Sequence, residues 1–138
     1  MNNPAGKQRP CTGADARARL RQAKAHLLAA DFMIGANADV SASDSVLAGI
    51  GAADALCCHH LRARSADGDH SRAVEMLAAV DRAAASKLRK LLAMKTRAQY
   101  DTAALSLRDA KAARRLAGEL VDLAETNLQS GGNEGRPV

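Results

Sequence analysis

The near absence of aromatic side chains is the feature that most constrains the fold of this chain. Its 138 residues include one Phe, one Tyr and no Trp, so the core must be built from aliphatic side chains and alanine. Alanine and leucine favour helices, whereas strands are enriched in β-branched and aromatic residues. The chain is therefore predicted to be all-α, and its length suits one domain with a single hydrophobic core.

Apolar residues recur with helical spacing along most of the chain. The pattern is clearest near the start, where Leu20, Leu27 and Ile34 stand seven residues apart with Leu28 beside them, a stripe predicted to face the core. Residues that favour helix N-termini precede several of the later apolar stretches. Four main helices and one short one are predicted. The first covers residues 14–38, the second begins at the Ser41–Asp44 cluster and ends near residue 64, and the short third helix begins at Ser71. The fourth contains Leu88 and Leu91 and ends at residue 99 or 100, and the last begins at Ser106 and turns Leu107 and Leu120 inward.

Both ends of the chain are rich in glycine and proline and poor in apolar residues. Residues 1–13 and 130–138 are therefore predicted to be flexible tails, with one helical domain over 14–129. The first ten residues are polar and lack the apolar stretch of a signal peptide. No apolar run approaches the roughly 18 residues that cross a bilayer. We expect a cytoplasmic protein with no membrane association.

The chain has three cysteines, an odd number, and no export signal. This pattern argues against a disulfide framework, so reduced thiols are expected. Cys57 and His60 stand three residues apart and share one helix face, but they supply only half of a structural zinc site. No metal or cofactor is therefore expected, and Cys57 is predicted to pack in the core. A metal-dependent regulator that uses Cys57 and His60 is an alternative.

Motifs for catalysis are missing from the sequence. No glycine-rich phosphate loop and no pair of catalytic carboxylates stands out, and the Cys57–His60 cluster is weak evidence for a cysteine nucleophile, because catalytic groups assemble in space. Catalytic residues therefore stay unassigned.

Basic residues give the chain a net charge of +5 and gather in two of the predicted helices. Such a surface can contact phosphates, although acidic residues interleaved with it would make it an ordinary solvated face. With so few aromatic side chains, binding of nucleic acid would depend on phosphates and shape. The basic residues are Lys87, Arg89, Lys90, Lys95 and Arg97 in the fourth helix and Arg108, Lys111, Arg114 and Arg115 in the last.

The fourth-helix segment reads Leu91-Leu92-Ala93-Met94-Lys95-Thr96-Arg97-Ala98-Gln99-Tyr100-Asp101, and an alanine-rich helix follows it. This order resembles the HEPN domain, in which a segment Leu-Leu-x-x-Arg-x-x-Ala-Asp-Tyr precedes a final alanine-rich helix. Lys95 matches the Arg of that segment, and the resemblance covers residues 18–125. It implies an up-and-down bundle of four or five helices, a homodimer and, as in many bacterial members, a nucleotidyltransferase partner.

HEPN domains that cut RNA use an Arg followed four to six residues later by a His, often with a Tyr two residues beyond. If Tyr100 matches that Tyr, Ala98 occupies the His position and no Arg stands near Ala93. The resemblance therefore implies a noncatalytic interaction module that associates with nucleic acid or a nucleotidyltransferase.

Three residues of this segment, Lys95, Arg97 and Tyr100, are the candidates for binding RNA or a partner. Tyr100 is also expected to cap the core at the end of its helix. The alternative function is a ribonuclease toxin of a toxin–antitoxin pair, which would combine these three residues with His59 or His60.

Overall fold

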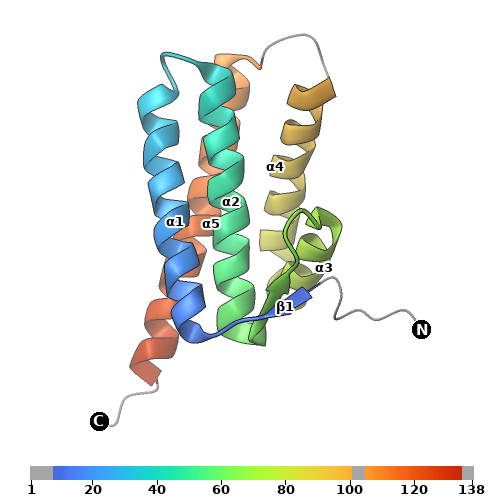
Figure 1. Cartoon of the computed structure of the whole chain (residues 1–138). Coiled ribbons are helices and arrows are strands. Elements are labelled where there is room, and N and C mark those ends of the chain that lie inside the picture. Colours follow the sequence, from blue (N-terminus) through green and yellow to red (C-terminus); the bar gives the residue numbers. More distant parts are fainter. Residues whose placement is uncertain (1–7, 101–104, 135–138) are drawn as a thin grey trace, which may run out of the picture.

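The computed structural model describes residues 8–100 and 105–134, which form a mostly helical bundle with one small strand pair (Figure 1). The all-α prediction is confirmed. Four long helices lie side by side, and the short α3 covers the lower part of α2 and α4. The helices are α1 (Gly13–Met33), α2 (Ala38–Leu61), α3 (His70–Val80), α4 (Arg82–Tyr100) and α5 (Leu107–Glu134), and the strands are β1 (Gln8–Pro10) and β2 (Ala63–Ser65).

Helix α2 is the centre of the bundle, and it packs against each of the other four helices. Its small residues allow close approach: a Cβ on Gly51 would lie 3.1 Å from Ala23 Cβ of α1, and one on Gly49 would lie 2.5 Å from Leu91 Cδ1 of α4. By length and hydropathy α2 is able to cross a membrane, but 72% of its most apolar window is buried inside the bundle. The composition of α2 is therefore that of a core helix.

The core of the bundle consists of leucines set among alanines. Leu20 and Leu120 are buried as predicted. Leu107 and Leu28 are not: Leu107, the first residue of α5, is 48% exposed although Leu105 just before it is buried, and Leu28 of α1 is 60% exposed. The side chains buried most completely are Leu56, Leu77, Leu88, Leu91 and Leu120.

An ion pair between Arg19 and Asp54 joins α1 to α2. Arg19 donates to Asp54 Oδ2 from Nη2 at 2.6 Å and from Nε at 3.2 Å. Asp54 is only 4% exposed, and burial raises the pKa of its carboxyl group while Arg19 opposes that rise. Breaking this pair would leave a buried carboxylate without its cation, so it fixes how α1 lies on α2.

Capping side chains stabilise the N-termini of the helices. Thr12 and Asp15 form a capping box at α1, and Ser106 and Asp109 pair in the same way at α5, as predicted. The start of α2 differs from the prediction, because Asn37 is the N-cap and the helix begins at Ala38. The predicted caps at 41–44 lie inside that helix, where the Ser41 hydroxyl donates to the carbonyl of Ala30 at 2.8 Å.

A disulfide between Cys11 and Cys58 overturns two predictions. These cysteines are not reduced thiols: their Cα atoms lie 5.4 Å apart, and only Cys57 is free. Residues 8–12 are not a tail, because β1 pairs antiparallel with β2 in the register Gln8 to Ser65. The odd number of cysteines was misleading because one of them is a core residue. The last helix also continues past residue 129 to Glu134.

Thiol counting tests the disulfide and the free cysteine together. Burial raises the pKa of Cys57 to about 12, and nearby Asp54 adds to the effect. Because the thiolate is the reactive form, no cysteine of the native protein should react with iodoacetamide at neutral pH. One should react after denaturation, and all three after denaturation with reduction. Two or more reactive thiols in the unreduced, denatured protein would disprove the disulfide.

A leucine in place of Gly51 tests the close approach of α1 and α2. The new side chain would meet Ala23 and the carbonyl of Arg19, so the two helices must separate. Overpacking of this kind should lower the free energy of unfolding by about 3 kcal/mol in urea denaturation. Gly35→Leu is the matched control, because nothing lies within 4 Å of a Cβ at that position. Equal stability of the two variants would refute the account of α2.

Candidate nucleic-acid interface

Helix α4 carries basic residues and no acidic ones. It forms because Leu88 and Leu91 bury one face against the core, which leaves the charged positions toward solvent. Arg82 and Arg89 stand seven residues apart, as do Lys90 and Arg97, so the two members of each pair lie on one side of the helix. The two pairs are about 100° apart around the helix axis, because Arg89 and Lys90 are adjacent. The cations of α4 are Arg82, Lys87, Arg89, Lys90, Lys95 and Arg97.

Most of these cations have no acidic partner within the described part of the chain. Arg97 pairs with Asp109 of α5, with Nη2 and Oδ1 3.2 Å apart. The other five make no ion pair with any residue in 8–100 or 105–134. Unpaired surface cations keep the full field that attracts an anion, and their concentration on one helix makes that field local. We call these five residues, Arg82, Lys87, Arg89, Lys90 and Lys95, the α4 cations.

The basic residues of α5 contribute less than the sequence pattern suggested. Arg114 is held by Asp31 of α1, with Nε and Oδ1 2.6 Å apart, and Arg115 lies 4.0 Å from Glu119. The predicted second half of the basic surface is thus partly neutralised by acids of its own and of a neighbouring helix. The interface is therefore centred on α4.

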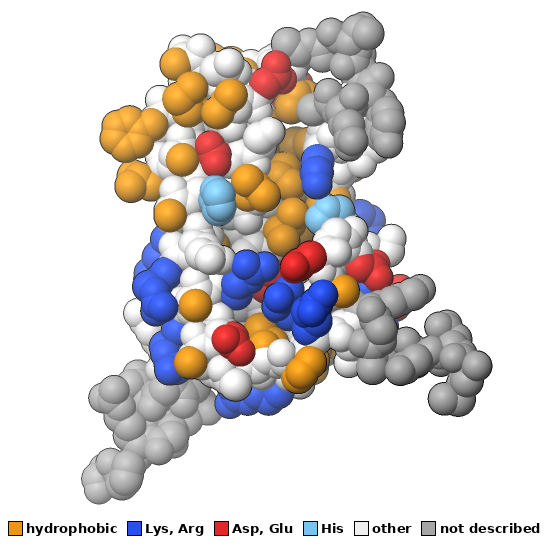
Figure 2. Space-filling model, viewed as in Figure 1, with side chains coloured by type: hydrophobic (Ala, Val, Ile, Leu, Met, Phe, Trp, Pro, Cys, Tyr) orange, Lys and Arg blue, Asp and Glu red, His pale blue; other side chains and the backbone are white. Residues whose placement is uncertain are grey.

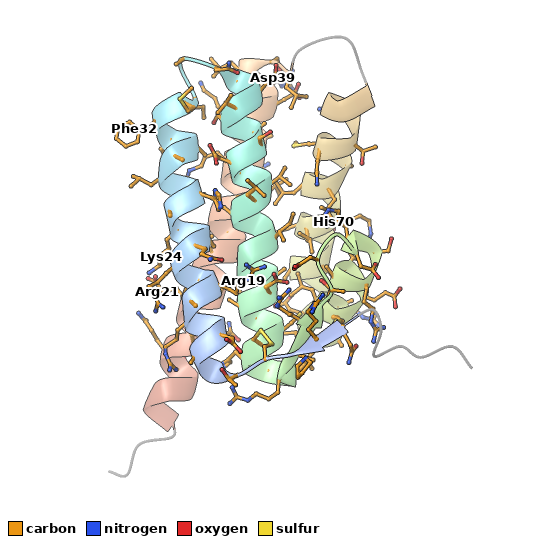
Figure 3. All side chains as sticks on the ribbon, in the orientation of Figure 1. Arg19, Arg21, Lys24, Phe32, Asp39 and His70 are labelled. Carbon is orange, nitrogen blue, oxygen red and sulfur yellow. A yellow bond between two sulfur atoms is a disulfide. The ribbon has the colours of Figure 1, made fainter. Side chains whose placement is uncertain are left out.

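A groove of about 540 Å³ opens between α3 and α4, next to the α4 cations. His70 is the first residue of α3, and Figure 3 shows where it lies beside α4. Ser71 and Thr96 add hydroxyl groups to the lining. None of the residues that line the groove is acidic; they include His70, Arg89 and Lys95 as polar groups and Val74, Leu92 and Ala93 as apolar ones.

The closest contact in this groove joins Lys95 Nζ to His70 Nε2 at 3.2 Å. Lys95 carries only donors, so Nε2 accepts and the neutral ring holds its proton on Nδ1. Burial lowers the pKa of His70, and the charge of Lys95 lowers it further. Asp69 and Asp54 oppose this lowering of the pKa. The groove is lined by the ammonium group of Lys95, the guanidinium group of Arg89 and the imidazole ring of His70.

The three residues singled out in the sequence take different positions. Lys95 lines the groove, whereas Arg97 turns to α5 and pairs with Asp109. Residues two apart on a helix do not face the same way, which explains this separation. The side chain of Tyr100 lies outside the described part of the chain, so its expected role as a cap stays a prediction.

The histidines proposed for the alternative sites lie far from Lys95. His59 and His60 are in the last turn of α2, at the lower end of the bundle, whereas α4 reaches the upper end after Lys95 (Figure 1). His60 lies 2.7 Å from Asn127 Oδ1 of α5. Cys57 is buried in the core, as predicted. Among the residues that the structure describes, no three His, Cys, Asp or Glu side chains are grouped to hold a metal ion.

His70 is the site residue that the sequence did not reveal. It follows a turn-forming stretch, and no local pattern marks it, because its neighbours Arg89 and Lys95 are distant in sequence. The only available signal was the absence of acids on the fourth helix, which marks the surface that His70 borders.

No protein-family model, curated protein or solved structure matches this chain. The interface therefore has to be interpreted from its own geometry and charge.

Proposed function

We propose that this protein is a noncatalytic, dimeric helical module of HEPN-like architecture that binds the phosphate backbone of RNA through α4. One observation supports the RNA-binding part most strongly: the α4 cations have no acidic partner among the described residues, and α4 itself contains no acid. A set of lysines and arginines concentrated on one exposed helix is the electrostatic footprint of nucleic-acid binding.

The length and chemistry of α4 fit contact with a backbone. A helix of 19 residues is about 28 Å long, which spans several successive phosphates of an extended strand. Phe32, an exposed aromatic side chain, lies on α1 and not beside the α4 cations, so among the side chains that the structure describes no Phe or Tyr offers a stacking platform there. Binding should accordingly depend on salt and show little preference for sequence.

Cleavage of RNA is not part of this proposal. The rival ribonuclease would need His59 or His60 beside Lys95. Both histidines are in the last turn of α2, at the lower end of the bundle, whereas Lys95 contacts His70 about halfway up (Figures 1 and 3). The described histidine next to Lys95 is His70, and no carboxylate lines their groove to orient the ring. RNA recovered from a binding assay should therefore be intact.

An apolar patch on α1 supports the dimeric part of the proposal. Leu28 and Phe32 stand one turn apart and are 60% and 78% exposed. Figure 2 shows hydrophobic side chains gathered over this upper part of the molecule, while basic ones are concentrated lower down. Asp31 and Arg114 add one charge of each sign beside the patch, which suits a two-fold contact with a second copy. A nucleotidyltransferase partner, which the HEPN resemblance implies, would compete for the same patch.

Salt-dependent binding of a fluorescent RNA oligonucleotide tests the role of α4. The double variant Arg89→Gln/Lys90→Gln should lower the slope of log affinity against log salt by about two, because each lost phosphate contact removes about one counterion equivalent. Both residues are exposed, so the variant should fold normally.

The matched control is Arg17→Gln/Arg21→Gln, which removes the same charge from exposed positions of α1. It should change the slope by less than half as much. An equal effect of the two double variants would mean that net charge alone attracts RNA. Absence of RNA binding at low salt would refute the proposed function.

Sedimentation equilibrium tests the dimer. Phe32→Glu places a charge in the apolar patch and should convert the dimer to a monomer. Leu61→Glu is the control, since Leu61 is also exposed, at 40%, but lies at the opposite end of the bundle; this variant should stay dimeric. A monomeric wild-type protein at tens of micromolar would contradict the dimeric part, as would a dimer unaffected by Phe32→Glu.

A further inference from the structure

The groove between α3 and α4 differs from the rest of the basic surface because it is concave. Arg89 and Lys95 line it from α4 and His70 lines it from α3, so nitrogen-bearing side chains of two helices share one groove. An extended RNA backbone that passes over the convex surface of a helix presents its phosphates one by one. A concave site lined by several donors instead suits a phosphate at the end of a strand.

The contact between Lys95 and His70 leaves part of the hydrogen-bonding capacity of Lys95 unused. The ammonium group has three donors, and one of them points to His70 Nε2 at 3.2 Å. No other partner of Lys95 is present among the described residues, and no acid lines the groove. The remaining donors of Lys95, together with the Arg89 guanidinium, are available for an anion with several oxygens.

We propose that this groove binds the terminal phosphomonoester of an RNA strand whose backbone lies on α4. The inference rests on the proposed function and names the part of the RNA that the groove recognises. A terminal phosphate has three unesterified oxygens and nearly two negative charges at neutral pH, whereas an internal diester has two such oxygens and one charge. An ammonium group and a guanidinium group in one groove, with several donors between them, match the first group better than the second.

The position and size of the groove agree with this assignment. Arg89 belongs to the α4 cations and also lines the groove, so a strand that follows α4 has a continuous path into it. The volume of about 540 Å³ is within the ordinary range of small-molecule sites. Val74, Leu92 and Ala93 give it an apolar floor, on which the last sugar and base can rest without selection for sequence.

Three versions of one RNA oligonucleotide test the inference: a 5′-phosphate, a 3′-phosphate and hydroxyl groups at both ends. The wild-type protein should bind at least one phosphorylated version about tenfold more tightly than the hydroxyl version, as expected for one added charge-assisted contact. The end that gives the preference identifies the polarity of the strand. Equal affinity for all three overturns the inference and leaves the proposed binding of the backbone intact.

Single variants of equal charge locate the effect. Lys95→Gln should reduce the preference for phosphate to less than about threefold. Lys87→Gln removes the same charge from the same helix outside the groove, and it should weaken all three RNAs equally while the preference remains. Thermal melts by circular dichroism confirm that each variant is folded. A preference that survives Lys95→Gln also overturns the inference.

A small probe separates this site from RNA binding altogether. Phenyl phosphate at millimolar concentration should shift the ring resonances of His70 in NMR spectra, and phenol at the same concentration should not. If the protein binds no RNA but responds to phenyl phosphate, the proposed function fails and the phosphomonoester site stands. If His70 does not respond to phenyl phosphate, the site is refuted whatever the RNA experiments show.

Discussion

The close approach of α2 to its neighbours is the constraint on which the rest of the molecule depends. A core almost without aromatic side chains cannot fill wide spaces between helices, so the helices have to lie near one another. Gly51 allows this against α1, and Gly49 allows it against Leu91 of α4. With those spacings set, Arg19 reaches the buried Asp54, and α4 is held with its apolar face inward and its cations outward.

Much of the fold could be predicted because its signals are local. Helical periodicity and the cap at Ser106 depend on residues within one or two turns, and the structure confirms them. What the sequence did not reveal depends on contacts across the chain. The Cys11–Cys58 disulfide joins residues 47 positions apart, and parity alone could not show which cysteine stays free. Leu107 has the right period for the core, but its side chain at the first residue of α5 is exposed.

The candidate site also combines features that are local in the sequence with features that depend on contacts across the chain. The absence of acids on α4 is visible in the sequence, and it correctly marked a basic helix. Whether each cation is neutralised is a tertiary property: Arg114 is paired by Asp31, 83 residues away, while Arg89 and Lys95 are not paired by any described acid. Lys95 was singled out from the HEPN resemblance, but its neighbour His70 comes from another helix and had no local signal. Lys95 and Arg97 were grouped as one candidate site from the sequence, but Lys95 lines the groove and Arg97 pairs with Asp109 of α5.

The central claim is that anions bind where cations are unpaired, and not wherever the chain is basic. NMR mapping of the backbone amides during titration with an RNA oligonucleotide tests it most directly, because both kinds of basic surface are observed in one experiment. The account predicts that the largest shifts fall on α4 and at the start of α3 near His70, with small shifts around Arg114, which Asp31 pairs. Shifts centred on α1 or on Arg114, with α4 unchanged, would contradict it.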